Sequence, residues 1–590
     1  MAVTRVFDLL DQLVEKYPKD DILSRKSAGK WIKYSSHSYS EHSHLVAYAL
    51  LSMGFEKGDK ALTIMPNRPE WNFLDMGIMM AGMVHVPVYT TLSTDDYLHI
   101  VNHSDAKVVF IGNDNLAKKI VPIIEKVDRE IKVFTVDPVS GYSSIEEIYN
   151  TGRSNADKYK EAVEKIKTET DENDVATIIY TSGTTGTPKG VMLSHKNLVF
   201  NFIGTAVQQI RDHRHKMLSF LPLCHIYERG MNYDYQYLGI SIYYAESLST
   251  IASDLADSKA DGFCAVPRVL EMMYSKLEAA GKDLSGIKKV IYSWAFRIAN
   301  KFDYTKNSPL YKLQYSIADK LVYSKWRAKL GGKEMLIVSG GSAIQAKIIR
   351  LFTAAKMYIF EGYGMTEASP VIAVNNPKEM IIKIGTVGKK MDGTELMIAD
   401  DGEILTRGPH VMLGYYKDPD YTKQVIDEEG WLHTGDIGVI VDKIFLKITD
   451  RKKEIFKLSA GKYIAPQVIE NMLKESSYIE NCMVVGENQK FASALIIPDI
   501  NKLHFWAAKH KIQFTDNHEL VQNPQVIKKI YSEIDKVNTK LAAHEQVKRA
   551  KLIIDEWTPL NDMLSQTLKL KRNKIKAKYS ETIAEIFKNE

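Results

Sequence analysis

The chain has little of several features that mark specialised classes of protein. Only three cysteines occur among its 590 residues, Cys224, Cys264 and Cys482, and no two of them form a CxxC pair. A zinc ribbon or a disulfide framework is therefore not expected, and reduced thiols are. Glycine accounts for 34 residues, which excludes a collagen-like chain or an array of flexible linkers.

Long apolar runs are also absent. The most apolar stretch, Phe73 to Tyr89, is interrupted by Asp75, His85 and Pro87, and it is shorter than the roughly 20 apolar residues that a membrane span needs. It predicts a buried helix followed by a short strand. The segment Thr4 to Tyr17 predicts an amphipathic surface helix, which differs from the apolar core of a signal peptide. We expect a soluble protein, at most peripheral to a membrane.

The excess of basic over acidic residues is small. The 78 basic and 73 acidic residues leave a net charge of +5, which is not the clustered excess of a nucleic-acid-binding surface. Hydrophobic residues make up 45% and charged residues 26%, so the chain is globular and not disordered. Basic residues gather between Lys569 and Lys578. That run is either a solvated helix face or a surface for phosphate groups.

Residues 1–449 alternate short apolar runs with helical patterns. Ala61 to Met65, Lys107 to Ile111 and Lys132 to Val136 are runs of strand length. This alternation predicts an α/β fold with largely parallel sheets. Residues 450–590 instead mix short strands with lysine-rich helices. The sequence thus predicts a large N-terminal domain of parallel-rich sheets and helices, and a smaller α+β C-terminal domain.

The most informative segment is Ile178 to His195, IIYTSGTTGTPKGVMLSH. An apolar strand runs directly into a loop of glycines and hydroxyl side chains that ends on Lys189. Glycines let backbone N–H groups approach a phosphate, and hydroxyls and a lysine add donors and positive charge. A P-loop would need a serine or threonine after its lysine. Gly190 stands there, so the segment is a different kind of phosphate-binding loop.

TSGTTGTPKG resembles the signature of the adenylate-forming superfamily, which comprises acyl-CoA synthetases, luciferases and peptide-synthetase adenylation domains. Further blocks of that superfamily follow in the same order and cover nearly the whole chain: LPLCHIYER (221–229), AVPR (265–268), SGG (339–341), EGYGMTE (361–367), GWLHTGD (430–436), DRKK (450–453) and GKYIAP (461–466). The residues of these blocks are most similar to those of the long-chain fatty acid–CoA ligase branch.

The resemblance implies a two-step ligase reaction. A long-chain fatty acid would be activated by ATP to acyl-AMP with release of pyrophosphate, and the acyl group would then pass to CoA. Both steps call for charge neutralisation around phosphate more than for acid–base catalysis. ATP, Mg²⁺ and CoA are the expected cofactors. The alternatives are a fatty acyl-AMP ligase that serves a carrier protein, and a medium-chain or aryl acid–CoA ligase. A non-enzymatic binding module is disfavoured because the family's charged residues are all present.

The resemblance also implies which residues of the large domain bind ATP. Glu367 would bind Mg²⁺, aided by Thr181, and Thr366 would contact the α-phosphate, while Tyr363 would stack on adenine. The other nucleotide-binding residues expected in this domain are Ser182, Gly183, Thr184, Thr185, Gly186, Lys189, Gly340, Gly341, Ser342, Glu361, Gly362 and Gly364.

In the C-terminal region, Asp436 would bind the ribose hydroxyls and Arg451 would add a ribose or phosphate contact. Asp450 would be the hinge between domains 1–449 and 450–590. The segment with Gly461 and Lys462 would turn toward CoA. Ala460 departs from the family, in which a glycine often precedes the position of Gly461.

Lys569 would be the late catalytic lysine that reaches the acyl carboxylate and the α-phosphate during adenylation. Its spacing to Arg572 fits the Lys-x-x-Arg of the family. Gln566 stands where a proline is often found, and Lys571 is a rival in register. We favour Lys569.

Three interpretations of His225 stay open. It could pair with Cys224 as a nucleophile, although neighbours in sequence rarely face one another. It could be a buried structural histidine, or, as the resemblance implies, lie near the acyl carboxylate and act there. The neighbouring block places Arg268 either in the same region or at a phosphate.

The expected partners are small molecules, namely the fatty acid, ATP and CoA, and no nucleic acid. A cytoplasmic location is expected. Peripheral contact with the inner face of a membrane is a hypothesis that rests on the insoluble substrate and the basic run Lys569 to Lys578.

Overall fold

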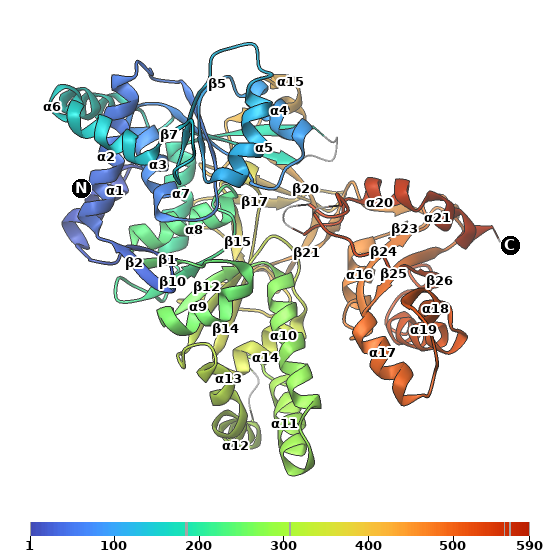
Figure 1. Ribbon diagram of the computed structural model, residues 1–590. Helices are drawn as coiled ribbons and strands as arrows, with labels where there is room; N and C mark the ends of the chain where they lie inside the picture. The colour runs from blue at the N-terminus through green and yellow to red at the C-terminus, as the bar shows by residue number, and fades with distance from the viewer. Residues whose placement is uncertain (1, 183–186, 306–307, 560, 566–567, 589–590) are drawn as a thin grey trace. The chain divides into compact units, whose positions relative to one another are not determined.

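The structure is a computed structural model that describes residues 2–182, 187–305, 308–559, 561–565 and 568–588. Its chain divides into two compact units. The first unit comprises Met1–Leu396 and Thr406–His433, and the second comprises Met397–Leu405 and Thr434–Glu590 (Figure 1). Each unit has its own sheets and its own hydrophobic clusters. The predicted α/β fold, with a large N-terminal and a smaller C-terminal part, is confirmed.

The chain passes between the units three times, after residues 396, 405 and 433. The predicted domain boundary at 449/450 lies later in the sequence, within the second unit. A hinge at Asp450 stays a prediction.

The larger sheet of the first unit has nine strands in the order β16-β15-β14-β13-β12-β10-β11-β1-β2. Its six central strands, from β14 to β1, are parallel to one another, whereas β15 and β2 pair with them antiparallel. The strands are β1 (Leu23–Ser27), β2 (Lys30–Tyr34), β10 (Lys216–Ser219), β11 (Ser241–Tyr244), β12 (Gly262–Ala265), β13 (Met335–Ser339), β14 (Met357–Gly364), β15 (Val371–Val374) and β16 (Lys389–Lys390).

The second sheet of this unit has eight strands in the order β19-β9-β8-β4-β3-β5-β6-β7. They are β3 (Lys60–Ile64), β4 (Val84–Pro87), β5 (Ala106–Ile111), β6 (Lys132–Thr135), β7 (Ser143–Ser144), β8 (Val175–Ser182), β9 (Pro188–Ser194) and β19 (Gly414–Tyr415). The three predicted strand runs correspond to β3, β5 and β6. The apolar stretch from residue 73 to 89 forms most of helix α3 (Pro69–Met80) and then β4, as predicted.

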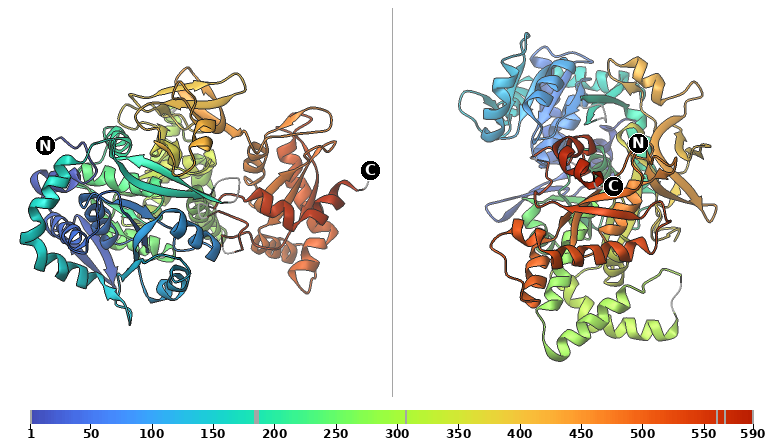
Figure 2. Two further views of the ribbon diagram at one scale, coloured as in Figure 1. Left: turned by 90° about the horizontal axis from the view of Figure 1, so that it is seen from above. Right: turned by 90° about the vertical axis from the view of Figure 1, so that its right-hand side faces the viewer.

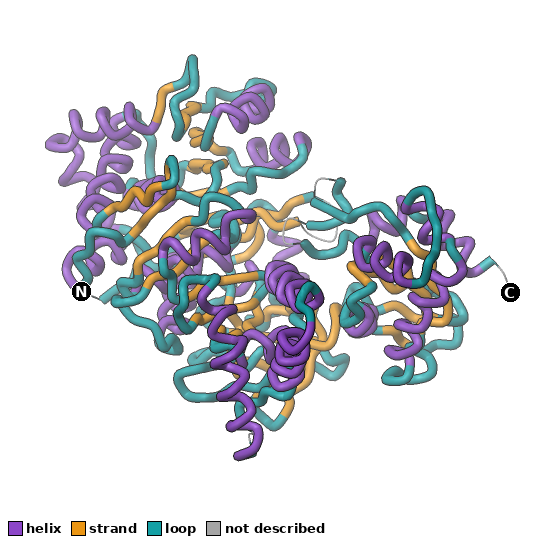
Figure 3. The backbone as a smooth tube through the Cα atoms, turned by 60° about the horizontal axis from the view of Figure 1, so that its bottom comes forward, coloured by secondary structure: helices purple, strands orange, loops and turns teal. Residues whose placement is uncertain are grey.

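Helices flank both sheets of the first unit (Figure 3). They are α1 (Asp8–Lys16), α2 (Ser36–Ser52), α4 (Thr94–His103), α5 (Asp114–Ile124), α6 (Ile145–Glu169), α7 (His195–Ala206), α8 (Ile226–Tyr237), α9 (Ile251–Ser258), α14 (Ala346–Ala354) and α15 (Pro419–Val425), with short turns η1 (Leu248–Thr250) and η3 (Thr366–Ala368). None of the helices in the described ranges is both long and apolar enough to cross a membrane. Cys224, Cys264 and Cys482 are buried free thiols, as the cysteine spacing predicts.

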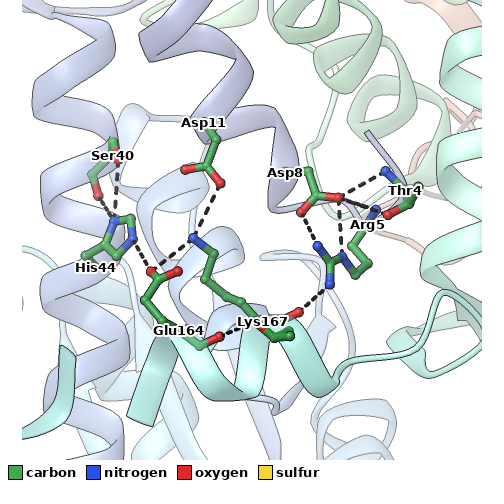
Figure 4. A network of polar contacts seen from close by, with 9 residues as sticks. Thr4, Arg5, Asp8, Asp11, Ser40, His44, Glu164 and Lys167 are labelled. Atoms are coloured by element: carbon green, nitrogen blue, oxygen red, sulfur yellow. Dashed lines mark hydrogen bonds and ion pairs between the residues drawn. The ribbon is translucent and has the colours of Figure 1, made fainter. Parts of the chain in front are cut away.

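Polar contacts fasten the N-terminal helix to α6 (Figure 4). The Asp8 carboxylate accepts hydrogen bonds from the backbone N–H groups of Thr4 and Arg5, at 3.0 and 2.8 Å. Arg5 in turn donates to the carbonyl oxygen of Lys167, whose ammonium lies 3.4 Å from Asp11. Thr4 and Arg5 stand before α1, so these bonds fix the segment that leads into the helix against Asp8, the first helical residue, and link it to α6.

A fully buried ionic cluster joins α3, β4, β8 and α8. The Arg229 guanidinium donates to the Asp75 carboxylate at 2.5 Å, to Thr177 Oγ1 at 2.7 Å and to the Tyr233 hydroxyl at 2.7 Å. The same carboxylate lies 2.6 Å from His85 Nδ1. Burial lowers the pKa of His85, and the positive charge of Arg229 acts in the same direction. The Arg229–Asp75 ion pair and its hydrogen bonds thereby connect four elements that are distant in sequence.

A helical arm follows β12. It consists of α10 (Pro267–Lys282), α11 (Gly286–Ala299), α12 (Pro309–Ala318), the π-helical turn η2 (Asp319–Tyr323) and α13 (Ser324–Ala328). In Figures 1 and 2 its helices extend away from the sheets of the first unit. Part of the arm packs through Ala295, Ala318 and Trp326 into the core on one face of the nine-stranded sheet.

The second unit is built around a three-stranded sheet in the order β24-β25-β26. Alternate residues of β24 face two different clusters: Cys482 and Val484 face one, Met483 and Val485 the other. The sheet is therefore covered on both faces, as the period of a strand requires. The elements are β17 (Glu395–Ile398), β18 (Glu403–Arg407), β20 (Leu432–Val441), β21 (Phe445–Arg451), β22 (Phe456–Lys457), β23 (Tyr463–Ile464), α16 (Pro466–Leu473), β24 (Ile479–Val485), β25 (Ala492–Pro498), α17 (Ile500–Lys509), α18 (Asn517–Gln522), α19 (Pro524–Asn538), β26 (Val547–Leu552), α20 (Arg572–Lys578) and α21 (Ser580–Phe587).

Candidate active site

Three predicted motifs begin at the same edge of the nine-stranded sheet. Ala265 at the end of β12 pairs with Ser339 at the end of β13, and Ser339 pairs with Glu361 of β14. The carboxyl ends of parallel strands are where open α/β sheets bind their ligands. Gly340 and Gly341 directly follow β13, and Gly362 lies within β14 next to Glu361, so the structure brings these residues to the same edge of the sheet, while Ser342 lies exposed in the loop that follows β13.

The glycines at this edge keep side chains out of it. A Cβ on Gly340 would lie 3.2 Å from the Tyr227 ring, whose hydroxyl donates to the Val338 carbonyl oxygen at 3.0 Å. A Cβ on Gly364, the last residue of β14, would lie 1.9 Å from the Pro370 carbonyl oxygen. No other amino acid fits position 364 without moving the backbone, so the bend that follows β14 requires glycine.

Glu361 is a buried carboxyl group at this edge. Its side chain accepts a hydrogen bond from the Gly385 N–H at 3.1 Å. Burial raises the pKa of Glu361 to about 8, because a charged carboxylate is costly to desolvate. The group is therefore mainly protonated at pH 7 and can donate one hydrogen bond while it accepts another.

The phosphate-loop segment is a β-hairpin. Strands β8 and β9 are antiparallel, with Thr181 opposite Lys189 and Ser182 opposite Pro188. A P-loop leads into a helix, so the strand after the loop is a second reason to exclude that motif. The predicted residues Gly183, Thr184, Thr185 and Gly186 lie outside the described residues.

Lys189 and Glu367 lie on two sides of Tyr415. The Lys189 ammonium lies 3.0 Å from the Asp418 carboxylate and 3.4 Å from the centre of the Tyr421 ring. It is also 5.7 Å from the centre of the Tyr415 ring. The Tyr415 hydroxyl donates to Glu367 Oε1 at 2.7 Å. The structure thus brings the hairpin residues and the YGMTE carboxylate into one site.

Tyr415, Asp418 and Tyr421 are site residues that the motif search missed. They come from β19 and the start of α15, and β19 pairs with β9 through Gly414 opposite Met192. Asp418 caps α15 by accepting from the Tyr421 N–H at 3.1 Å. The only signal in the sequence is the Asp-Pro pair of a helix start, which gives no hint of a lysine far earlier in the chain.

His225 caps a helix. It is the N-cap residue of α8, and its Nδ1 accepts from the Tyr227 N–H at 3.1 Å. Burial raises the pKa of the Cys224 thiol far above its usual range, so a Cys–His nucleophile has no ready thiolate. The cap favours a structural role for Nδ1, while a role of His225 near the acyl carboxylate stays a prediction.

In the second unit, Asp436 and Arg451 face each other on β20 and β21. They are paired residues of the ladder, and Arg451 Nε lies 3.1 Å from Asp436 Oδ1. The neighbouring Asp450 accepts from the Arg451 and Gln467 N–H groups at 2.6 and 3.2 Å. Burial raises the pKa of Asp450 to about 7.

Gly461 and Lys462 form the turn between β22 and β23. The Gly461 N–H donates to the Leu458 carbonyl oxygen, and the Leu458 N–H donates to that of Lys462, both at 2.8 Å. Gly461 has a φ of +81°, which favours glycine, whereas Ala460 is not among the residues with positive φ. The turn therefore accepts alanine at position 460.

The two rival lysines of the tail have different surroundings. Lys571 forms an ion pair with Asp562 and precedes the first turn of α20. Lys569 is half-buried, and its backbone is bonded on both sides to Ser565. The ion pair of Lys571 with Asp562 is consistent with Lys569 as the predicted catalytic lysine. The catalytic role of Lys569 stays a prediction.

Two family models match this chain. The model of the AMP-binding enzyme matches residues 10–416, and that of the AMP-binding enzyme C-terminal domain matches residues 453–590. The chain belongs to the AMP-binding enzyme family. The first match includes every block from TSGTTGTPKG to EGYGMTE, and the second includes the GKYIAP block and Lys569.

Relatives of this family match along nearly the whole chain. Long chain acyl-CoA synthetase 6, peroxisomal, of Arabidopsis thaliana is 32% identical, over 95% of this chain and 82% of its own length. Long-chain-fatty-acid–CoA ligase FadD15 of Mycobacterium tuberculosis is 30% identical, over 99% of this chain and 98% of its own length. Among solved structures, the anthranilate CoA ligase AuaEII in complex with anthranoyl-AMP has a TM-score of 0.72 at 18% identity, with 98% of both chains covered. The last likeness shows the fold.

The donor set at Glu367 suits a magnesium ion that arrives with ATP. Mg²⁺ usually takes one or two carboxylates and completes its shell with water and phosphate oxygens. Glu367 offers one half-buried carboxylate that Tyr415 orients. Thr366, in the same motif, and Thr181, in the TSGTTGTPKG motif, each offer a hydroxyl. Within the described ranges, no group of three or more histidine, cysteine, aspartate or glutamate side chains could hold a metal without a substrate.

A cavity of about 560 Å³ lies between the helical arm and the nine-stranded sheet. It is lined by Glu334 and Tyr358, at the amino ends of β13 and β14, whereas the family motifs begin at the carboxyl ends. Aromatic side chains make up much of its wall: Phe302, Tyr304, Tyr311, Tyr315, Tyr358 and Phe360. Phe360 directly precedes Glu361, so the cavity reaches from the arm to the strand that carries the EGYGMTE block.

Proposed function

We propose that this chain is a long-chain fatty acid–CoA ligase. It forms acyl-AMP from a fatty acid and ATP, releases pyrophosphate, and passes the acyl group to CoA with release of AMP. The observation that carries the proposal is the 30% identity to a long-chain-fatty-acid–CoA ligase over 99% of this chain and 98% of that relative. Such mutual coverage leaves no large segment of either chain unmatched.

The first step needs positive charge at the α-phosphate, where the fatty acid oxygen attacks. Lys189 and Thr181 sit opposite each other at the end of the β8–β9 hairpin. Lys189 pairs with Asp418, and the two side chains are 20 and 39% exposed. The carboxylate faces solvent, so the ammonium would exchange it for a phosphate oxygen of ATP, which carries more negative charge.

Glu367 would hold the Mg²⁺ of Mg-ATP. The bound ion neutralises phosphate charge and polarises the phosphorus–oxygen bonds. The chain's own contribution is orientation: the Tyr415 hydroxyl fixes one carboxylate oxygen at 2.7 Å and leaves the other for the ion.

Glu361 would recognise the adenine edge. Because burial raises its pKa to about 8, its carboxyl group is a donor and an acceptor at neutral pH. The adenine edge likewise presents an amino donor beside a ring-nitrogen acceptor. The glycines at 340 and 341 leave room for the flat ring, and Tyr363 would stack on it.

The second unit would contribute the remaining groups in two steps. Asp436 and Arg451 would bind the ribose, and Lys569 would neutralise the acyl carboxylate and α-phosphate during adenylation. A rotation about Asp450 would then bring the turn with Gly461 and Lys462 to CoA. We also propose a cytoplasmic location, with the fatty acid, ATP and CoA as partners and a peripheral contact with a membrane.

Product analysis tests the ligase. Purified protein is incubated with ATP, Mg²⁺ and acids from acetate to stearate, with and without CoA, and the nucleotides and acyl products are separated. AMP and acyl-CoA that rise with chain length and require CoA are expected. Accumulation of acyl-AMP that is indifferent to CoA would point to a carrier protein as acceptor, and ADP as the product would overturn the adenylation itself.

A further inference from the structure

The helical arm carries a row of apolar side chains that nothing covers among the described residues. Leu310, Leu313 and Ile317 of α12 and Leu321 of η2 are 65, 62, 45 and 40% exposed. Their spacing of three, four and four residues places them on one helical face. The opposite face of α12 is occupied, because Tyr311 and Tyr315 line the arm's cavity. The helix is thus apolar on both faces, and only one of them is packed.

The neighbouring helix α11 packs against α12 and is exposed in the same way. Its Ile287 and Val290 are 76 and 64% exposed. In Figures 1 and 2 these two helices form the part of the arm farthest from the sheets of the first unit. Monomeric soluble proteins rarely expose apolar side chains in such groups, and those that do use them for contact.

The arm is also strongly basic. The helices α11 and α12 through α13 hold seven lysines and arginines and one aspartate, Asp319, and Arg327 pairs with that aspartate at 2.6 Å. The excess of six positive charges exceeds the +5 of the whole chain. Within the described ranges no acidic side chain lies at ion-pair distance from the exposed lysines of these helices, which are Lys288, Lys289, Lys312, Lys320 and Lys325.

The basic run near the C-terminus is different. Lys574, Lys576 and Lys578 pair with Asp562, Glu487 and Asp555 at 3.3, 3.0 and 2.7 Å. Their charge is therefore largely neutralised within the second unit. Of the two interpretations of this run, the structure favours the helix face, and the arm is the better candidate for an anionic surface.

A row of leucines with lysines near it suits the surface of an anionic bilayer, which has an apolar acyl-chain region beneath charged headgroups. Apolar side chains of such a helix enter the boundary between headgroups and acyl chains, while lysines reach the lipid phosphates. Each lysine near an anionic surface adds to the attraction. We propose that α11 and α12 dock on an anionic membrane surface through Leu310, Leu313, Ile317 and Leu321, with Lys320 and Lys325 on lipid phosphates. This gives the proposed ligase, on which the inference rests, the surface from which it takes its insoluble substrate.

Flotation of the full chain with vesicles tests the docking. Vesicles of phosphatidylcholine alone are compared with vesicles that contain 30 mol% phosphatidylglycerol. The apolar variant is Leu310→Ser/Leu313→Ser/Ile317→Ser. Its matched control is Val439→Ser/Ile440→Ser/Ile444→Ser, which changes three second-unit residues that are 46, 43 and 50% exposed. We expect the arm variant to lose at least about tenfold in binding to the anionic vesicles and the control to bind as the unchanged chain does.

A charge variant separates the lysines from the leucines. Lys320→Gln/Lys325→Gln should lower anionic binding by about fivefold for each lysine at low salt. Lys576→Gln/Lys578→Gln serves as its control and should have little effect. Equal binding to both vesicle types, or equal losses in both charge variants, would overturn the role of the arm lysines.

Two further measurements keep the outcomes apart. Acyl-CoA formation from palmitate kept below its solubility limit, without vesicles, reports folding and the proposed function independently of docking. Vesicle binding without ligase activity would therefore contradict the proposed function alone, and activity without vesicle binding would contradict the docking alone. Sedimentation that finds a dimer lost in the serine variant, with no vesicle binding, would assign the leucine row to a second copy of this chain instead.

Discussion

Replacing Arg229 by Met is expected to destabilise the first unit strongly. Arg229 and Asp75 have no exposed surface and lie 2.5 Å apart. Removal of one partner leaves the other charge buried without compensation, which costs about 3–5 kcal/mol. Asp75→Asn/Arg229→Met removes both charges and keeps an amide for His85 and Tyr233. The double variant should be more stable than the sum of the single losses by about 2 kcal/mol or more.

The deficit of Arg229→Met should also depend on pH. In the native chain burial lowers the pKa of His85, and the charge of Arg229 adds to this. Without Arg229, the Asp75 carboxylate at 2.6 Å favours the imidazolium, so the folded-state pKa of His85 rises relative to that in the native chain. A higher folded-state pKa adds stability as the pH falls, and this gain is lost as the pH rises. The deficit should thus be smaller at pH 6 than at pH 8.

Urea unfolding followed by tryptophan fluorescence measures both effects, because the Trp71 ring centre lies 5.3 Å from the Arg229 guanidinium carbon. Arg214→Met is the matched control. Its guanidinium pairs with Asp212 at 2.6 Å, but the side chain is 74% exposed, so no measurable change is expected. If Arg229→Met were as stable as this control, or if the two single losses simply added, the reasoning about the buried pair would fail.

Three further predictions concern catalysis. Lys569→Ala should lower acyl-AMP formation by about a hundredfold or more and spare thioester formation from supplied acyl-AMP. Lys571→Ala is the control, and equal loss in both half-reactions would refute the assignment. Glu367→Gln should raise the Mg²⁺ concentration needed for half-maximal rate by about tenfold, and an unaltered Mg²⁺ dependence would contradict its role. Lys189→Met should raise the KM for ATP clearly more than Asp418→Asn, whose effect should stay below about fivefold because the Asp418 side chain is exposed; a larger effect of Asp418→Asn would show that the pair is part of the ATP site.

The sequence predicts the framework well because its signals are local. Strand-length apolar runs become β3, β5 and β6, and the motifs after β12, β13 and β14 meet because parallel strands end at one edge. Tyr415 and Asp418 could not be found in this way. Their partners Glu367 and Lys189 stand 48 and 229 residues away, and only the pairing of β19 with β9 brings them together.

At the C-terminal lysine run and at α12, the sequence pattern alone does not show which side chains are paired or packed. The lysines of the C-terminal run resemble a solvated or phosphate-binding face until their carboxylate partners, scattered over the second unit, are placed. Conversely, α12 shows no polar face in its sequence, so its periodicity does not reveal which side is packed. Only the positions of Tyr311 and Tyr315 against the cavity separate the covered side from the exposed one.

The three passages of the chain between its units have a consequence for dissecting the protein. Residues 397–405 belong to the second unit although the chain then returns to the first, and they contribute to β17 and β18, which complete the sheet with β20 and β21. A fragment that begins at Thr434 would lack these strands and expose the edge of β20, which invites aggregation. Separate expression of the C-terminal part should therefore start after this sheet, near residue 453, where the second family model begins. A protease cut between β20 and β21 would leave the two halves of the chain held together by a shared sheet.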